Sequence, residues 1–252
     1  ASRLPRGAAG DVLVNLHMIQ MTLQRQPLLR FARAHDLLAA RADDPGYLLH
    51  AWLAAMFGER APKPFYFLQK RGQLFAYAAH DAASLLEHAA AFADPLAHAA
   101  LAPDGLASKE MPRQWPAGKQ LRLHVRACPI ARKGAEEKDV FLRAVERWTE
   151  AGETSDTKPD RGTVYCDWMA RQAVGRGIDI ERIMLNGYRA RVVMQRRSRN
   201  AASTGLKYVE RPEAEFELLA RITDSDRFNE LLDRGVGRHR AFGFGMVRLL
   251  PV

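Results

Sequence analysis

The hydrophobic and polar positions of the first half of the chain predict short strands and helices. These elements follow from the periods of the apolar residues and from turn signals such as Gly58 and Arg71-Gly72. They are a strand over 11–23, a helix over 47–57, a hairpin of strands over 64–68 and 73–79, and a helix from Asp81 to 93. The stretch 95–118 is broken by proline and glycine, and no element is predicted there. The order strand, helix, strand, strand, helix is most simply that of a split βαβ, or ferredoxin-like, domain.

The second half begins with a strand over 119–128 that has one basic face. Three apolar residues alternate there with three basic ones, which are Arg122, His124 and Arg126. The elements predicted after it are helices over 136–151 and 163–175, a strand over 178–195 with an early turn at Asn186-Gly187, a strand over 213–222, a helix over 224–234 and a terminal strand over 244–250. We therefore predict an α+β fold of two tandem ferredoxin-like (RRM-like) domains, 11–115 and 117–252, with a helical insertion in the second. Residues 1–10 are expected to be a leader outside both domains.

The composition favours a polyanionic partner. The 252 residues include 38 lysines and arginines against 29 aspartates and glutamates, which gives a formal net charge of +9. Arginine supplies most of this charge, and its guanidinium binds phosphate in a bidentate manner, so nucleic acid is the favoured partner. The two cysteines, Cys128 and Cys166, form no disulfide framework, and we expect a cytoplasmic protein. No apolar run predicts a membrane span and no signal peptide is recognised.

The C-terminal segment 234–252 interleaves glycines with arginines. The glycines are Gly235, Gly237, Gly243 and Gly245, and the arginines are Arg234, Arg238, Arg240 and Arg248. Backbone N–H groups in such a loop can form a concavity that binds anions beside the guanidinium groups. The alternative is a helix cap at Gly235 and a tight turn into the last strand.

Two other groups of residues could act on RNA. Tyr47 and His50 lie three residues apart at the start of a predicted helix, and histidine can take or give a proton in phosphodiester chemistry. The basic turn that contains Arg196, Arg197, Arg199 and Lys207 could bind an RNA stem by its shape and phosphates. The structural alternatives are a helix-end histidine beside a packed tyrosine, and a solvated surface loop. The basic face of strand 119–128 is equally compatible with RNA and with solvent.

The sequence suggests neither a cofactor nor a metal ion. His80, His88 and His98 lack the cysteine or carboxylate partners of a metal site. The signatures of phosphate-binding loops, dinucleotide-binding folds and serine nucleophiles do not occur.

The segment Gly235–Val252 resembles the C-terminal glycine-rich loop of the CasE-type (Cse3-like) CRISPR RNA endoribonucleases. Three other segments resemble this family in the same order along the chain, so that the likeness spans about residues 44–252. They are Pro45–His50, which matches the family's Tyr-x-x-His; Leu121–Ile130, which matches its Arg-Ala-Asn-Pro strand end; and Trp168–Arg171, which matches its Trp-Leu-x-Arg helix.

This resemblance implies a metal-independent endoribonuclease with tandem ferredoxin-like domains. The family cuts CRISPR precursor RNA at the base of the repeat stem-loop, leaves a 2′,3′-cyclic phosphate, and commonly stays on the guide RNA with the other subunits of an effector complex. His50 would be the acid/base and Tyr47 its companion at the scissile phosphate. The residues expected to bind RNA are Arg196, Arg197, Arg199, Lys207, Arg238, Arg240, Gly237, Gly243, Arg25, Arg41 and Arg126.

The chain departs from the family in two places. The span before His50 is longer and rich in arginine, and Cys128 stands where the family has asparagine. A divergent type IV homologue would fit the longer span, with Arg25, Arg30, Arg33 or Arg41 helping to organise the active site. Two further interpretations are a non-catalytic subunit that holds the guide-RNA stem, and a basic RNA-binding protein unrelated to CRISPR.

Overall fold

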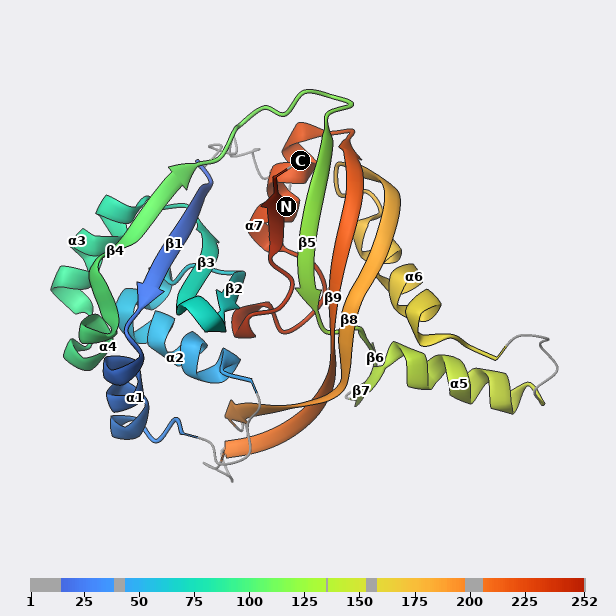
Figure 1. The fold of residues 1–252 in the computed structure, drawn as a ribbon, viewed down its shortest axis with the longest axis horizontal. Coiled ribbons are helices and arrows are strands. Elements are labelled where there is room, and N and C mark those ends of the chain that lie inside the picture. The colour runs from blue at the N-terminus through green and yellow to red at the C-terminus, as the bar shows by residue number, and fades with distance from the viewer. Residues whose placement is uncertain (1–14, 39–43, 135, 153–157, 198–205, 252) are drawn as a thin grey trace, which may run out of the picture.

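The computed structural model describes residues 15–38, 44–134, 136–152, 158–197 and 206–251 of the chain. These residues form an α+β fold with two antiparallel four-stranded sheets side by side (Figure 1), so the predicted α+β class is confirmed. A third, two-stranded sheet is a short hairpin. None of the helices in the described part is long and apolar enough to cross a membrane.

The first sheet has the strand order β2-β3-β1-β4, with antiparallel neighbours throughout. Its elements are β1 (His17–Leu23), α1 (Arg25–Ala34), α2 (Gly46–Phe57), η1 (Gly58–Arg60), β2 (Phe65–Leu68), η2 (Gln69–Arg71), β3 (Gln73–Ala78), α3 (Ala82–Phe92), α4 (Pro95–Ala100) and β4 (Leu101–Glu110). The predicted helix that stops at Gly58, the hairpin around Gly72 and the helix after Asp81 are confirmed. The first predicted strand is shorter, since β1 begins at His17, and residues 11–14 lie outside the described part.

Three elements of the first half are missing from the sequence prediction. No helix is predicted where α1 lies, and the stretch 95–118, for which no element is predicted, contains α4 and β4. Strand β4 buries only Leu101 and Leu106 and includes Pro103 and Gly105. It lies at the edge of the sheet beside β1, where a proline removes no hydrogen bond that the sheet needs. The sequence of β4 therefore lacks the alternation of apolar and polar residues from which a strand is predicted.

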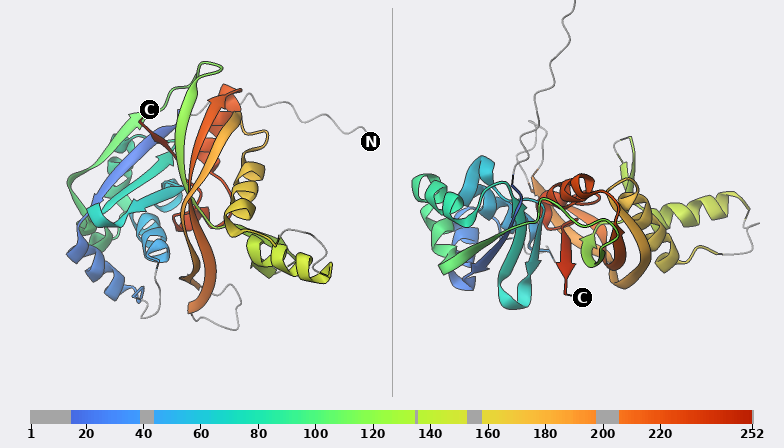
Figure 2. Two further views of the ribbon diagram at one scale, coloured as in Figure 1. Left: turned by 45° about the vertical axis from the view of Figure 1, so that its right-hand side comes forward. Right: turned by 90° about the horizontal axis from the view of Figure 1, so that it is seen from above.

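The second sheet has the order β10-β5-β9-β8. Its half of the chain contains β5 (Gln120–Ala127), β6 (Ile130–Lys133), β7 (Glu136–Asp139), α5 (Val140–Glu150), α6 (Arg161–Ala173), β8 (Ile178–Arg197), β9 (Leu206–Ile222), α7 (Ser225–Arg234), η3 (Arg240–Phe242) and β10 (Val247–Leu250). Helix α5 and the β6–β7 hairpin project from the body on one side, as both views in Figure 2 show.

Several predictions for the second half were wrong in detail. The strand predicted over 213–222 begins already at Leu206, and the terminal strand begins only at Val247. Residues 136–139 form strand β7, which pairs with β6, and the helix starts only after Asp139, whose side chain caps it. Asn186-Gly187 is no turn, because β8 continues as one strand from Ile178 to Arg197. A register shift between Leu185 and Gly187 shows that the dipeptide lies at an irregularity of the β8–β9 ladder instead.

The two halves are joined by apolar packing and by one buried hydrogen bond. One core lies between helices α1–α4 and the first sheet. The other core combines α6, α7 and the second sheet with Tyr66 and Tyr77 of the first half. The Tyr77 hydroxyl donates to the Val247 carbonyl oxygen at 2.9 Å. Between the halves, the far end of the β8–β9 hairpin curves toward α2 (Figure 1), and this brings β8 residues to the start of that helix.

Candidate active site

Helix α2 carries the two predicted catalytic residues at its N-terminal end. Asp44 helps to begin the helix, since its Oδ2 accepts a hydrogen bond from the Gly46 N–H at 3.1 Å. Leu49, Trp52, Leu53 and Met56 lie on the face that packs into the core, which leaves Tyr47 and His50 only partly buried.

Both residues contact one aromatic ring from the opposite end of the chain. Phe242 in η3 stacks on Tyr47 with ring centroids 6.3 Å apart, and its centroid lies 5.0 Å from that of His50. The approach of η3 to α2 requires glycine at position 46, because a Cβ there would lie 2.3 Å from the Phe242 carbonyl oxygen. The folded chain therefore brings the C-terminal loop directly to the predicted catalytic helix.

Arg196, near the end of β8, completes this cluster. Its guanidinium carbon lies 3.5 Å from the centroid of Phe242, and its Nη2 lies 3.0 Å from Nδ1 of His239. Among the described residues, no carboxylate forms an ion pair with Arg196. Burial lowers the pKa of Arg196 to about 10, which leaves the side chain charged at neutral pH. A cation without a paired carboxylate is suited to binding a phosphate.

The surroundings of His50 favour its neutral form. Burial lowers the pKa of His50 from its ordinary value, and the positive charges of Arg196 and Lys63 lower it further. A neutral imidazole at pH 7 can accept a proton from a hydroxyl group.

An open groove of about 790 Å³ runs beside this cluster. Its lining is rich in basic side chains and includes the single carboxylate of Asp233; the lining residues are Lys63, Pro64, Asp233, Arg234, Gly237, Arg238, His239, Arg240, Ala241 and Phe242. Burial raises the pKa of Asp233. Since Lys63 and Arg240 are exposed and pair with no carboxylate among the described residues, the groove presents free positive charge.

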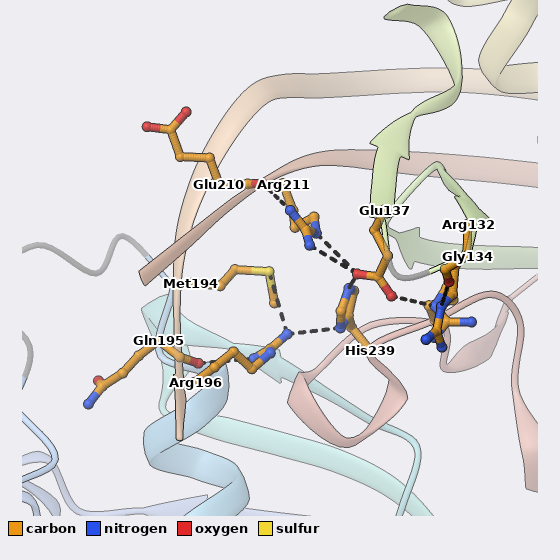
Figure 3. A network of polar contacts seen from close by, with 10 residues as sticks. Arg132, Gly134, Glu137, Met194, Gln195, Arg196, Glu210, Arg211 and His239 are labelled. Carbon is orange, nitrogen blue, oxygen red and sulfur yellow. Dashed lines mark hydrogen bonds and ion pairs between the residues drawn. The ribbon is translucent and has the colours of Figure 1, made fainter. Parts of the chain in front are cut away.

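Glu137 of β7 lies at the centre of a network of polar contacts (Figure 3) that includes the groove residues Arg238 and His239. Its carboxylate accepts hydrogen bonds from Arg211 at 3.0 Å, Arg238 at 2.7 Å and His239 at 3.1 Å. Burial alone would raise the pKa of Glu137, but His239 and the two arginines outweigh it and the pKa is lowered. Three segments far apart in the sequence are thus joined at one carboxylate.

His239 links this carboxylate to Arg196. Because Arg196 donates to Nδ1, the proton of the neutral ring is placed on Nε2, which donates to Glu137. Burial, followed by the charge of Arg196, lowers the pKa of His239 to about 4. His239 is therefore neutral at physiological pH and orients Arg196 toward Phe242.

Arg126, predicted to bind RNA, is buried between the two halves. Its Nη2 lies 2.8 Å from Asp44 Oδ1, its Nε lies 2.8 Å from Glu213 Oε2, and the guanidinium stacks on Phe244. Burial alone would lower the pKa of Arg126, but the two carboxylates raise it above its ordinary value. This arginine fixes the start of α2 against the second sheet, and we do not include it in the RNA surface.

The rest of the basic face of β5 is paired in the same way. Arg122 binds Glu217 at 2.7 Å, and His124 Nε2 lies 3.7 Å from Glu215. Each partner lies diagonally across the β5–β9 ladder. His124 and Arg126 on this face also contact the first half of the molecule, through Tyr66 and Asp44, whereas the Arg122 side chain is partly exposed.

The glycine-rich loop uses much of its backbone for internal contacts. Gly235 donates to Leu231, Val236 donates to Gly245, and the Gly245 N–H donates to the Arg126 carbonyl oxygen. A Cβ at Gly237 would lie 3.1 Å from the Trp168 ring, and one at Gly243 would lie 3.1 Å from the Phe65 ring. These two predicted RNA contacts are packing positions, and Gly235 caps α7 as the structural alternative expected.

The other predicted RNA-binding residues lie in several places. Arg25 is exposed at the start of α1, and Lys207 is exposed on β9 opposite Arg196. Arg238 and Arg240 line the groove. The backbone of Arg197 pairs with Leu206, but its side chain, Arg199 and Arg41 lie outside the described residues.

The sequence interpretation missed Phe242, Lys63, His239 and Glu137 as parts of this site. Phe242 offered a signal, as an aromatic residue inside the glycine-rich loop; the others offered none, since they reach the site only through the fold. In the described ranges of the chain, no group of three or more His, Cys, Asp or Glu residues could hold a metal ion.

Comparisons with known proteins identify the family of this chain and proteins of similar fold. A family model described as CRISPR associated protein matches residues 17–251. No curated protein matches the sequence. Similar folds occur in Thermus thermophilus Cse3 bound to an RNA representing a pre-cleavage complex, at 17% identity over 94% of this chain and 100% of that chain, with a TM-score of 0.56. Cas6e from Escherichia coli K-12 is similar at 14% identity over 94% and 99% of the two chains, with a TM-score of 0.50.

A chain of a CRISPR RNA-guided surveillance complex in a pre-nicking state is similar at 16% identity. That match covers 94% of this chain and 100% of the other, with a TM-score of 0.55. The structural likeness therefore extends over nearly the whole chain. The resemblance found in the sequence is confirmed: the chain belongs to the family of CRISPR-associated proteins.

Proposed function

We propose that this protein is a metal-independent endoribonuclease that cuts the CRISPR repeat stem-loop and remains on the guide RNA. The observation that carries the proposal is the cluster at Phe242, which joins Tyr47 and His50 of α2 to the unpaired cation of Arg196. RNA binding by Cse3 supports the substrate class. The similar chain in a surveillance complex supports retention beside other subunits of an effector complex.

The proposal includes the domain organisation. The order strand, helix, strand, strand, helix, strand occurs in both halves, and each sheet places its last strand beside its first. This is the order of a ferredoxin-like unit. We assign such units to 11–115 and 117–252, with the β6–β7 hairpin and α5 inserted in the second.

The cleavage step uses the 2′-hydroxyl of the substrate as its nucleophile. Neutral His50 takes the proton from this hydroxyl as the 2′-oxygen bonds to phosphorus. The bond from phosphorus to the 5′-oxygen breaks, and that oxygen takes up a proton from water. The products are a 2′,3′-cyclic phosphate and a 5′-hydroxyl. Arg196 stabilises the negative charge that develops on the phosphate oxygens, and the Tyr47 hydroxyl donates a hydrogen bond to the same group.

The stem binds along the groove and the adjoining β8–β9 hairpin. Paired RNA is bound mainly through its shape, its phosphates and its 2′-hydroxyls. Lys63 and Arg240 supply free cations in the groove, and Lys207 supplies one on the hairpin. Arg197 and Arg199, which follow Arg196 closely in the sequence, are included in the proposed stem contacts.

The test is cleavage of the repeat RNA from the CRISPR array of the source genome, in EDTA. We expect wild type to cut once and His50→Ala to lose about 10²- to 10⁴-fold in rate, while it still binds the stem-loop. His98→Ala is the matched control, since His98 is exposed on α4. A 2′-deoxy substitution at the nucleotide before the cut should stop cleavage and leave binding intact.

The alternative function has its own outcome in this experiment. Tight binding of the repeat without cleavage by wild type would identify a non-catalytic subunit that holds the guide-RNA stem. Cleavage that persists in His50→Ala would indicate that the arginines, and not His50, carry out the chemistry. No binding of the repeat would contradict both functions.

A further inference from the structure

A second cavity lies on the other side of the start of α2, between α1 and the β2–β3 hairpin. It has a volume of about 490 Å³, within the range of about 300–1,000 Å³ that small-molecule sites occupy. Its lining residues are Leu23, Arg25, Leu28, Leu29, Pro45, Phe67, Gln69, Lys70, Arg71 and Gly72. We call this cavity the α1 pocket. The stem-binding surface described above does not include it.

The charge of the α1 pocket is entirely positive. Arg25, Lys70 and Arg71 are exposed at the pocket, and no carboxylate lines it. Within the described part of the chain, none of these three cations pairs with a carboxylate, unlike Arg126 or Arg238. Three unpaired cations around one cavity favour an anion with more than one phosphate.

The floor of the α1 pocket is apolar and aromatic. Leu28 and Leu29 come from α1, and Phe67 comes from β2; all three are partly buried. A partly buried phenylalanine between leucines and cations offers a surface for stacking a base. The bases of a paired stem are already stacked on one another, so a single-stranded nucleotide is the form of RNA that can use it.

The walls of the pocket are fixed by backbone hydrogen bonds. The Leu23 N–H donates to the Gly72 carbonyl oxygen at 2.8 Å, which holds the hairpin turn against the end of β1. The Gln24 N–H donates to the Ala100 carbonyl oxygen at 2.8 Å, which holds the start of α1. The cavity is thus formed before any ligand binds.

The position of the pocket relates it to the cleavage site. Pro45 lines the pocket and directly precedes α2, two residues before Tyr47. RNA cut at the base of a stem continues beyond the stem as a single strand. We propose that the α1 pocket binds a single-stranded nucleotide that flanks the repeat stem, with its base on Phe67 and its phosphates on Arg25, Lys70 and Arg71. This inference rests on the proposed function and adds a second, single-stranded binding site to it.

The test compares three RNAs that carry a 2′-deoxy nucleotide at the cut and so stay intact. One is the bare repeat stem-loop, and the other two carry six single-stranded nucleotides on the 5′ side and on the 3′ side. We expect one of the two extensions to lower the Kd of wild type about five- to a hundredfold, as stacking of a base on an aromatic ring does. Phe67→Leu, which keeps the apolar volume, should remove this gain and leave the Kd of the bare stem-loop unchanged.

Charge-reversal variants on one helix provide the matched control. Arg25→Glu should weaken binding of the extended RNA, whereas Arg30→Glu should not, because Arg30 is exposed on α1 and does not line the pocket. A 4-thiouridine in the extension should crosslink to the peptide that contains Phe67. A crosslink to the peptide of Arg240 instead would overturn the inference.

The outcomes separate the two proposals. If wild type binds all three RNAs with equal Kd, or if Arg25→Glu behaves like Arg30→Glu, the α1 pocket does not bind RNA and the proposed function stands. If wild type binds none of the three RNAs, the proposed function fails, and this inference fails with it.

Discussion

The basic residues of this protein lie in two regions with different surroundings. Between the two halves, Arg126 contacts Asp44 and Glu213, and at the wall of the groove Arg211 and Arg238 share Glu137. Arg196 beside the groove, Lys63 in the groove and Arg25 in the α1 pocket have no paired carboxylate among the described residues. We call these the paired region and the unpaired region.

The difference shows that net charge alone does not locate an RNA surface. A formal charge of +9 favours a polyanion, yet much of the arginine content is neutralised within the fold. A carboxylate at hydrogen-bonding distance cancels most of the field of a guanidinium and uses its donors. Paired arginines therefore stabilise the arrangement of the two sheets, and only unpaired cations remain to bind phosphate.

His239 lies at the boundary between the two regions. One ring nitrogen donates to Glu137, and the other accepts from Arg196. This histidine connects the orientation of the unpaired Arg196 to the paired network.

The largest expected effect comes from breaking the paired region. Arg126→Met leaves the buried Asp44 without a cation and leaves Glu213 with Arg189 as its partner, and loss of one partner of a buried pair costs about 3–5 kcal/mol. Urea denaturation should show this loss, whereas Arg25→Met, at an exposed site, should change the free energy of unfolding by less than about 0.5 kcal/mol. Equal stability of the two variants would contradict the division into regions.

The next effect is a pH dependence at the boundary. The pKa of His239 is about 4 in the folded protein against 6.5 as its ordinary value, so the unfolded chain binds a proton first as pH falls. The contribution of neutral His239 to the free energy of unfolding is therefore fully present above pH 6.5. It is lost as pH falls toward 4, by about 3 kcal/mol in all. Glu137, with its lowered pKa, adds a loss in the same direction below its ordinary pKa of 4.5.

His239→Asn separates these two contributions in a series of urea denaturations across pH. Asparagine tolerates the left-handed backbone of this position, where φ is 61°. The variant should lose most of the decline between pH 6.5 and 4.5, with a smaller part left from His50, whose pKa is also lowered, and should keep a decline below pH 4.5. A decline above pH 4.5 as large as that of wild type would assign it to a group other than His239.

A smaller effect is expected when the unpaired region is broken at Arg196. Arg196→Met removes hydrogen bonds to phosphate, and a bond to a charged group contributes about 1.5–3 kcal/mol, so RNA affinity should fall about 10- to 100-fold. The loss of stacking on Phe242 should cost about 1 kcal/mol of stability. Filter binding measures the loss of RNA affinity, and urea denaturation of the same variant measures the loss of stability. A stability loss as large as that of Arg126→Met would place Arg196 in the paired region.

The smallest effect distinguishes single cations by salt dependence. Lys63→Ala and Lys207→Ala should each reduce the slope of log K against log salt by about 0.7–0.9, the contribution of one phosphate contact. Arg122→Ala should leave the slope unchanged, since Arg122 pairs with Glu217. Equal slopes for all three variants would mean that pairing does not decide which cations meet RNA.

The local elements were largely predictable from the sequence, because they depend on neighbouring residues. The helix that begins beside Asp44-Pro45 and ends at Gly58, the turn at Gly72 and the helix capped by Asp81 each have a local signal. The edge strand β4 had no such signal. Its stability comes from pairing with β1, which no local pattern records.

For the site, the sequence by itself determined the family, the α+β class and the helix that carries Tyr47 and His50, since motifs and periodicity are properties of adjacent residues. Only the tertiary structure decided that Phe242 and Arg196 meet that helix and that Arg126 is neutralised. The carboxylates opposite β5 do alternate along β9 as Glu213, Glu215 and Glu217, but their register with Arg122, His124 and Arg126 is set by pairing across about 90 residues. Whether an arginine binds RNA or stabilises the fold depends on whether a carboxylate distant in the sequence pairs with it. That pairing is decided only when the strands assemble into the sheet.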